Sequence, residues 1–343
     1  MKKIAFFDAK SYDIASFNQV NKNYEIKYFE SKLNINTVVL AKGMDAVCVF
    51  VNDEVIEDVL DKLDEYGIHL LALRCAGYNN VDIEKAYKKV HVVRVPAYSP
   101  YAVAEHAMAL LLTLNRKIHK AYIRTKDFNF NIQGLTGFDL YNKTVGVIGT
   151  GKIGQIFINI CKGFGMNVLA YDPYPKSDAD YQYVTLDKIF TDSDIISLHC
   201  PLTKETKHLI NQESISKMKD DVVIINTSRG ALVDSNALLL GLKEKKIMGA
   251  ALDVYEEEAN LFFEDNSQEI IQDDILSLLI SLPNVIITSH QGYLTKEALE
   301  NIAQTTISNF DDYFNNRYLE NEVCYHCNSK GKDCFEKRKK RCW

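Results

Sequence analysis

Short hydrophobic runs rich in β-branched and aromatic residues alternate with longer stretches of helical spacing along most of the chain. Runs of the first kind are typical of buried strands, and the second kind is typical of helices that cover a sheet. Strands that alternate with helices pair in parallel, so the pattern predicts an α/β fold. In the first hundred residues the predicted strands are 3–8, 24–29, 46–51, 69–75 and 90–96.

A second series of the same kind begins at residue 143. Between the two series, residues 100–122 have helical spacing with Pro100 in the first turn, and they predict one long helix. A further amphipathic stretch, 295–316, predicts a helix that returns to pack on the first domain, which makes that domain discontinuous. The strands of the second series are predicted at 143–149, 167–172, 194–201, 222–228, 248–254 and 284–290.

The composition fits two domains of ordinary size, since the chain has 343 residues and is 47% hydrophobic. No apolar stretch reaches the roughly 18 residues of a membrane helix, and no secretory segment is visible, so we expect neither membrane insertion nor export. The net charge of −6 comes from 40 basic and 46 acidic residues that are mixed along the chain, which argues against nucleic-acid binding. Eight cysteines without a signal peptide favour a reducing compartment and a cytoplasmic protein.

The strongest local motif is GTGKIG at 149–154, which follows a predicted strand and precedes a predicted helix. In that context Gly149 allows a tight turn, Gly151 admits a pyrophosphate close to the backbone, and Gly154 lets the helix pack on the strand. The next strand ends at Asp172, whose carboxylate would bind the adenosine ribose and repel a 2′-phosphate. The motif predicts NAD rather than NADP; the alternative is a glycine-rich turn beside a solvated aspartate.

Three polar residues follow later strands and suit the dehydrogenation of a hydroxy acid: Arg229, Glu258 and His290. Ligands of open α/β sheets bind beyond the carboxyl ends of the strands. His290 would exchange the hydroxyl proton, because an imidazole titrates near neutrality. Glu258 would fix the tautomer and stabilise the protonated ring, and Arg229 would bind a substrate carboxylate through two parallel hydrogen bonds. Taken singly, each of the three is more often a surface or hydrogen-bonding residue, and only their combination with the dinucleotide motif favours a catalytic site.

At this point the sequence resembles the D-isomer-specific 2-hydroxyacid dehydrogenases, and within that family the fermentative D-lactate dehydrogenase branch. The resemblance extends to about Val323. It implies a Rossmann NAD-binding domain, a flavodoxin-like substrate domain and an active site in the cleft between them. The motifs are RCAGYNNVD (74–82), VPAYSPYAVAEHA (95–107), VGVIGTGKIG (145–154), NTSRGALVD (226–234), ALDVYEEE (251–258) and SHQGYLT (289–295).

Residue by residue, the resemblance places Arg229, Glu258 and His290 at the catalytic positions. It implies that Asp253 lies near the nicotinamide carboxamide. The remaining cofactor positions that it implies are Lys152, Ile153, Cys200, Pro201, Thr206, Thr227 and Ser228. The substrate positions that it implies are Ala76, Gly77, Tyr98 and Tyr293, although both tyrosines also suit ordinary buried positions.

The resemblance further implies domain boundaries, a reaction and an assembly. The substrate domain would comprise 1–99 and 297–330, and the NAD-binding domain 100–296. The expected reaction is the reversible reduction of pyruvate to D-lactate with NADH, by a homodimer or higher homo-oligomer. The aromatic pair and the scarcity of basic residues beyond Arg74 favour a small unphosphorylated acid.

Two alternatives remain open. The substrate could be another 2-keto acid, as in dehydrogenases of the D-2-hydroxyisocaproate type, because Glu257, Gln291 and Gly292 depart from commoner family patterns. The chain could also be an NAD(H)-sensing binding protein, because the same fold serves in such proteins. His106, within the predicted long helix, has no assigned chemistry, and we expect a packing or capping role for it.

The segment 324–343 forms a separate tail that contains cysteines and a KRKKR run. The spacing of Cys324 and Cys327 is that of a metal knuckle, and Cys334, Cys342 or His326 could complete four ligands. The later spacings are irregular, so the favoured interpretation is a reduced, flexible tail, and zinc is the weaker alternative.

Overall fold

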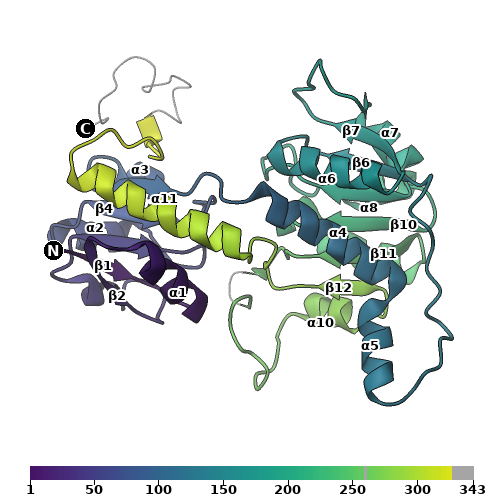
Figure 1. Cartoon of the computed structure of the whole chain (residues 1–343), viewed down its shortest axis with the longest axis horizontal. Helices are drawn as coiled ribbons and strands as arrows, with labels where there is room; N and C mark the ends of the chain where they lie inside the picture. Colours follow the sequence, from purple (N-terminus) through teal and green to yellow (C-terminus); the bar gives the residue numbers. More distant parts are fainter. Residues whose placement is uncertain (259–260, 327–343) are drawn as a thin grey trace. The chain divides into compact units, whose positions relative to one another are not determined.

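The computed structural model describes residues 1–258 and 261–326. The chain divides into two compact units (Figure 1). The first unit comprises Met1–Ser99 and Leu294–Trp343, and the second comprises Pro100–Tyr293. The chain therefore leaves the second unit after Tyr293, slightly before the boundary expected at 296/297.

A five-stranded parallel sheet forms the centre of the first unit, in the order β2-β1-β3-β4-β5. This is the 2-1-3-4-5 order of flavodoxin-like folds. The inner strands β3 and β4 are buried along their whole length, which explains why their sequences AVCV and LLAL are continuously apolar. The strands are Lys2–Phe6 (β1), Tyr24–Tyr28 (β2), Ala46–Val49 (β3), Leu70–Leu73 (β4) and His91–Arg94 (β5).

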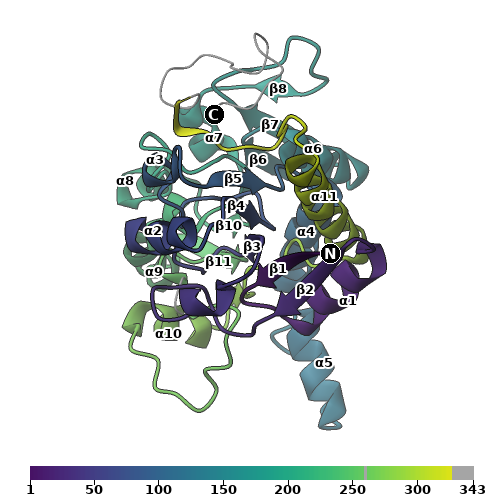
Figure 2. The ribbon, with the colours of Figure 1, turned by 90° about the vertical axis from the view of Figure 1, so that its left-hand side faces the viewer.

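Helices cover both faces of this sheet: α1 and α11 lie on one side, and α2 and α3 on the other (Figure 2). Helix α11 packs against α1, β4 and β5, so the C-terminal part of the chain does return to the first unit. The hydroxyl of Tyr24 donates to Asp311 of α11 at 2.6 Å. The helices are Ser11–Val20 (α1), Glu57–Glu65 (α2), Ile83–Ala86 (α3) and Lys296–Phe314 (α11), and a 3-10 turn spans Val38–Ala41.

The residues after α11 attach to the edge strand β5. The amide of Val323 donates to the carbonyl of Val92 at 2.8 Å, and His91 Nδ1 lies 2.6 Å from Glu322 Oε1. Cys324 is buried and free, whereas Cys327, Cys334 and Cys342 of the proposed knuckle lie outside the described residues. Within 1–258 and 261–326, no three His, Cys, Asp or Glu side chains gather as metal ligands.

A buried arginine joins the strands of the first unit. The guanidinium of Arg74 donates to the carbonyls of Phe7 and Asp8 at 3.0 and 2.6 Å, and its Nε lies 3.4 Å from Asp13 Oδ1. Burial raises the pKa of the Asp13 carboxyl, and Arg74 only partly offsets that effect. Arg74, the basic residue that the sequence placed near the substrate, therefore has its hydrogen bonds inside the unit.

We predict that Arg74→Met lowers the free energy of unfolding by about 3–5 kcal/mol, because it leaves Asp13 and two carbonyls buried without their partner. Urea denaturation followed by circular dichroism measures this change. The control is Lys62→Met, which removes an exposed ion pair with Glu65 and is expected to leave stability unchanged within error. Wild-type stability in Arg74→Met would contradict the prediction.

The second unit is built on a seven-stranded parallel sheet in the order β12-β11-β10-β9-β6-β7-β8. Counted from β6, this is the Rossmann order 3-2-1-4-5-6 with one strand added beside the sixth. The order reverses between β6 and β9, where such sheets bind their ligand. The strands are Thr144–Ile148 (β6), Asn167–Tyr171 (β7), Gln182–Tyr183 (β8), Ile195–Leu198 (β9), Val222–Asn226 (β10), Ile247–Leu252 (β11) and Val285–Ile287 (β12).

Two hydrophobic clusters, one on each face of this sheet, form the core of the second unit. Helices α4 and α6 cover one face, with α4 packed on α6 and on β10, β11 and β12. The described helices on the other face are shorter. The bounds are Pro100–Arg116 (α4), Lys152–Gly163 (α6), Leu186–Asp192 (α7), Gln212–Lys217 (α8), Ser235–Lys243 (α9) and Asp274–Ser281 (α10), with a 3-10 turn at Gly230–Leu232.

The single long helix predicted at 100–122 is wrong. Helix α4 ends at Arg116, Lys117 takes a left-handed conformation with φ 49°, and a separate helix, α5 (Ile118–Lys126), follows. Helix α5 buries none of its residues, so sheet packing no longer supports a straight continuation. The Asn115 side chain, hydrogen bonded to the backbone of Phe138, holds the end of α4 in place. No described helix combines the length and hydrophobicity needed to cross a membrane.

Candidate active site

One row of residues marks the carboxyl ends of the strands in the second unit. Pairing in register joins Tyr171 to Ile148, Ile148 to Leu198, Leu198 to Asn226, Asn226 to Leu252 and Leu252 to Ile287. Neighbouring strands lie about 4.8 Å apart. Every candidate residue of this unit, Tyr293 included, follows a member of this row within eight residues along the chain. The row therefore delivers the predicted cofactor and catalytic residues to one edge of one sheet.

The glycine-rich loop between β6 and α6 has the shape that a pyrophosphate requires. Gly149 has φ +96°, and a Cβ there would lie 2.6 Å from the backbone of His199 and Cys200. A Cβ on Gly154 would lie 2.0 Å from the Gly149 carbonyl oxygen. At Gly151 a Cβ would meet nothing within 4 Å, so this glycine faces open space at the first turn of α6. The loop fits a dinucleotide, with Lys152 and Ile153 as the first residues of the helix.

Asp172 lies immediately after β7, and the glycine-rich loop holds its carboxylate. The amide and hydroxyl of Thr150 donate to Asp172 Oδ2 at 2.8 and 3.1 Å, and the amide of Tyr174 donates to Oδ1 at 2.9 Å. The hydroxyls of Thr150 and Tyr183 lie 2.8 Å apart. The sequence did not single out Thr150, because a threonine inside GTGKIG carries no signal of this contact. A carboxylate fixed in this place suits the ribose of NAD.

The remaining predicted cofactor residues lie in the loops after β9 and β10. Thr206 donates to the carbonyl of Pro201 at 2.7 Å and closes the loop that follows Cys200, and Ser228 Oγ donates to the carbonyl of Leu198 at 2.9 Å. Thr227 is buried, and its hydroxyl has no hydrogen-bond partner among the described protein atoms. A buried hydroxyl of this kind suits a site that binds a polar ligand. Burial lowers the pKa of nearby His199 to about 3, so this ring is a neutral support beneath the glycine loop.

His290 and Glu258 form a hydrogen-bonded pair. His290 Nδ1 lies 2.7 Å from Glu258 Oε1, while the amide of Tyr255 donates to Glu258 Oε2 at 2.8 Å. Both side chains are 22% exposed, so the pair is sheltered but still reachable. The ring of Phe263 lies 6.0 Å from the imidazole, centre to centre. Because the carboxylate occupies Nδ1, the ring's other nitrogen, Nε2, is the one left for a substrate proton.

Arg229 lies three residues after β10, between Ser228 and the 3-10 turn. Its Nη1 donates to the Ser228 carbonyl at 2.7 Å, and the Asn226 side chain donates to the Arg229 carbonyl at 2.8 Å. Its position is also set by Gly230, where a Cβ would lie 2.0 Å from the Tyr255 backbone. The loop of Arg229 is thus pressed against the loop that leads to Glu258.

The predicted substrate residues are divided between the two units. Ala76, Gly77 and Tyr98 belong to the first unit, and Tyr293 belongs to the second. Arg94 donates to the carbonyl of Ala76 at 2.7 Å, and the carbonyl of Tyr98 accepts from Asn301 at 2.8 Å. Tyr293 is buried.

These observations define a class. The Rossmann strand order, the open glycine loop, the fixed aspartate after the second strand and a histidine–glutamate pair on the same sheet edge together indicate a nicotinamide-dependent oxidoreductase. Residues 108–292 match the family described as D-isomer specific 2-hydroxyacid dehydrogenase, NAD binding domain. The chain belongs to this family, and NAD is its cofactor.

Relatives match nearly the full chain. A 2-hydroxyacid dehydrogenase homolog of Haemophilus influenzae is 51% identical over 327 residues, which cover 94% of this chain and 99% of that protein. The D-lactate dehydrogenase of Escherichia coli is 50% identical over 327 residues, with the same coverage. The solved apo structure of the Escherichia coli enzyme superimposes with a TM-score of 0.87 and 47% identity, covering 94% of this chain and 99% of that one.

We predict that Glu258→Gln lowers kcat about a hundredfold, because the substitution removes the charge beside His290 and no longer fixes its tautomer. Steady-state rates of NADH oxidation with a 2-keto acid measure the effect. The matched control is Glu257→Gln, since Glu257 is exposed and adjacent in sequence. Equal rates in the two variants would argue against a role for the Glu258 carboxylate.

Proposed function

We propose that this chain reduces pyruvate to D-lactate with NADH, and oxidises D-lactate with NAD in the reverse direction. The observation that carries the proposal is the 2.7 Å hydrogen bond between His290 and Glu258 at the sheet edge that also bears the glycine loop. The near full-length similarity to a D-lactate dehydrogenase supports pyruvate as the substrate. Bound NADH would supply the hydride. The residues of this chain bind and orient the substrate and supply the proton.

In the proposed mechanism His290 supplies the proton. During reduction its Nε2 donates to the keto oxygen as that oxygen gains negative charge, and during oxidation it accepts the hydroxyl proton. The Glu258 carboxylate accepts the Nδ1 hydrogen and balances the charge of the imidazolium form. Because Tyr255 occupies the other carboxylate oxygen, Glu258 is held in one orientation while His290 changes charge.

Arg229 binds and orients the substrate carboxylate in this proposal. A guanidinium can donate two parallel hydrogen bonds to a carboxylate, which fixes both the position and the rotation of a small acid. From the family resemblance we also assign substrate binding to Ala76, Gly77, Tyr98 and Tyr293, with Tyr98 near the substrate carboxylate. The internal hydrogen bonds of Arg74 are consistent with a substrate that has no phosphate.

For the cofactor, Gly149, Gly151 and Gly154 would cradle the pyrophosphate at the start of α6, and Asp172 would bind the adenosine ribose. Thr227 has a buried hydroxyl available for the same ligand. Asp253 would lie near the carboxamide. The remaining positions are Lys152, Ile153, Cys200, Pro201, Thr206 and Ser228.

We predict that the wild-type protein oxidises NADH with pyruvate and that His290→Asn lowers kcat by about 10²- to 10⁴-fold while NADH affinity is retained. Arg229→Gln is expected to lower kcat/KM for pyruvate about a hundredfold, because a charged hydrogen-bonded pair is lost. Absorbance at the NADH band measures both rates, and quenching of NADH fluorescence measures binding.

The same assay separates the alternatives. Pyruvate, phenylpyruvate, hydroxypyruvate and 2-ketobutyrate are compared as substrates, and a preference for a bulkier acid would identify a D-2-hydroxyisocaproate type of enzyme instead. NADH binding without oxidation of NADH by any of these acids would favour an NAD(H)-sensing protein and reject the proposal.

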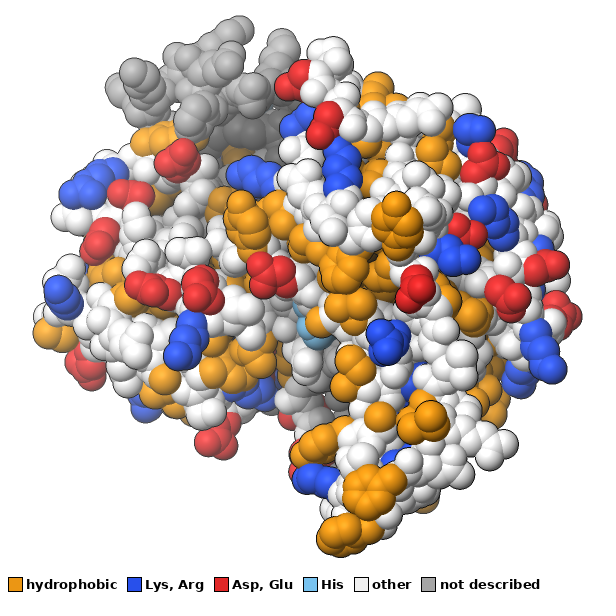
Figure 3. Space-filling model, turned by 45° about the vertical axis from the view of Figure 1, so that its right-hand side comes forward, with side chains coloured by type: hydrophobic (Ala, Val, Ile, Leu, Met, Phe, Trp, Pro, Cys, Tyr) orange, Lys and Arg blue, Asp and Glu red, His pale blue; other side chains and the backbone are white. Residues whose placement is uncertain are grey.

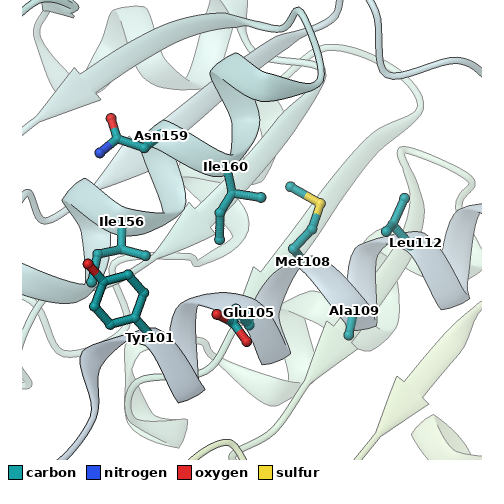
Figure 4. A pocket seen from close by; sticks show the side chains of 8 residues that line it. All are labelled: Tyr101, Glu105, Met108, Ala109, Leu112, Ile156, Asn159 and Ile160. Carbon is teal, nitrogen blue, oxygen red and sulfur yellow. The ribbon is translucent and has the colours of Figure 1, made fainter.

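We also propose that the protein is a cytoplasmic homodimer that associates through α4 and α6. A groove of about 560 Å³ lies between these helices, with Tyr101, Glu105, Met108, Ala109 and Leu112 on α4 and Ile156, Asn159 and Ile160 on α6 (Figure 4). Hydrophobic side chains gather on this face of the second unit and on the protruding end formed by α5 (Figure 3). Cys48, Cys161, Cys200 and Cys324 are free thiols, which is consistent with a reducing compartment.

We predict that the wild type sediments at twice its chain mass of 39.0 kDa and that Ala109→Arg shifts it toward the monomer. Ala109 is exposed, so an arginine there changes the surface and leaves the core intact. The control is Leu240→Arg, an exposed position of α9 on the other face of the sheet. Sedimentation velocity checks both variants, and an unchanged mass in Ala109→Arg would place any interface elsewhere.

A further inference from the structure

His106 is a histidine of α4 to which the mechanism above gives no part. Its Nε2 lies 3.2 Å from Asp253 Oδ1 and 3.2 Å from Thr288 Oγ1. Asp253 follows β11, and Thr288 follows β12, so the helix contacts the ends of two neighbouring strands. His106 therefore contacts the carboxyl ends of these strands from the face of the sheet that α4 covers.

Asp253 is the centre of a dense set of hydrogen bonds. It is 1% exposed, and its carboxylate accepts from the Thr288 hydroxyl at 2.5 Å, from the Gln291 amide at 2.9 Å and from the Gly292 amide at 2.7 Å. Burial by itself raises the pKa of Asp253, but the hydrogen bonds and charge supplied by His106, with those of Thr288 and Gln291, outweigh it and hold the pKa below its usual range. The carboxylate is thus an ionised acceptor.

The hydrogen-bond directions follow from that ionised state. An ionised carboxylate only accepts, and the Thr288 hydroxyl already donates its hydrogen to Asp253. His106 Nε2 must then carry a hydrogen, which it shares between the Asp253 and Thr288 oxygens. His106 therefore donates a hydrogen bond from α4 to the Asp253 carboxylate.

The backbone that carries His290 depends on the same aspartate. His290 has φ +54°, a left-handed conformation that costs a non-glycine residue about 1 kcal/mol. Its amide donates to the Asp253 carbonyl at 2.7 Å, and the next two amides donate to the Asp253 carboxylate. A Cβ at Gly292 would lie 2.9 Å from Asp253 Oδ2 and 3.4 Å from His106 Cδ2. The loop therefore wraps closely round a carboxylate that His106 and Thr288 hold in place.

We propose that His106 is a positioning residue for His290: with Thr288 it fixes the Asp253 carboxylate, and that carboxylate fixes the backbone of 290–292 from which the imidazole projects. The inference rests on the proposed function, because that function assigns His290 as the proton donor. It connects α4, through Asp253, to the loop that carries the catalytic histidine. Misplacement of a reacting group by about 1 Å can cost as much as a hundredfold in rate.

The test compares His106→Leu with His106→Gln in the full chain. Leucine keeps the volume and removes the donor, whereas the Nε2 of glutamine can take the place of the imidazole Nε2. His106→Leu is expected to lower kcat for pyruvate reduction at least about tenfold, with NADH affinity changed no more than about threefold. His106→Gln is expected to recover most of the loss. With NADH deuterated at the transferred position, the isotope effect on kcat should increase in His106→Leu, because hydride transfer becomes more rate-limiting.

Two controls separate positioning from general destabilisation. His119→Leu, on α5, removes another histidine of the second unit and should leave kcat and the isotope effect unchanged. Thr288→Val removes the other donor to Asp253, and its effect combined with His106→Leu should be less than additive, since both act through one carboxylate. A fall in active fraction alone would lower kcat without changing the isotope effect.

Amide hydrogen exchange of the peptide containing 290–292 gives a readout that does not depend on activity. Exchange should be faster in His106→Leu than in wild type, with His106→Gln between them. Wild-type kcat, isotope effect and exchange in His106→Leu would overturn the inference. If the wild type reduced no 2-keto acid, the proposed function would fail, and the exchange measurement would still decide whether His106 fixes the loop.

Discussion

The parallel register of six neighbouring strands, from Tyr171 through Ile148, Leu198, Asn226 and Leu252 to Ile287, is the constraint on which the site depends. Each strand ends at the same level, so residues as distant in sequence as Gly149 and His290 leave the sheet along one edge. Hydrogen bonding of the backbone sets this level, and the continuous apolar sequences of the strands stabilise it by burial on both faces. Loop residues can then differ widely in chemistry without disturbing the frame that presents them.

Two close contacts between backbone segments fix the positions of the loops at this sheet edge. Gly154 sits where a Cβ would collide with the carbonyl of Gly149, and Gly230 sits where one would collide with the backbone of Tyr255. The first approach shapes the cofactor loop, and the second presses the Arg229 loop against the segment that carries Glu258. At both glycines backbone atoms are in direct contact, so the two segments cannot shift relative to each other as packed side chains can. The first contact thus fixes the start of α6 to the cofactor loop, and the second fixes the two catalytic loops to each other.

Buried charges have different tasks in the two units. In the first, Arg74 directly after β4 contacts Asp13 of α1 and the carbonyls of Phe7 and Asp8 after β1, and so connects α1 to the ends of two strands. In the second, Asp253 lies at the strand ends, and its partners are the backbone amides of the loop that bears His290. Burial raises the pKa of Asp13, whereas the hydrogen bonds of Asp253 hold its pKa down despite burial. An aspartate that stays ionised can organise a loop, because a carboxylate accepts several hydrogen bonds at once.

The sequence by itself determined the strands of both series except the two-residue β8 (Gln182–Tyr183), together with the dinucleotide loop and the strand-end residues, because these depend on periodicity and on local glycine chemistry. The resemblance supplied further positions, such as Thr206 and Tyr98. The sequence did not predict the break between α4 and α5, because helical spacing continues past Lys117. The first helix ends at Arg116, where the buried positions that face the sheet also end. The contacts of Thr150 with Asp172 and of His106 with Asp253 were decided by the tertiary structure alone, since hydrogen bonds between residues far apart in sequence leave no periodic or local trace.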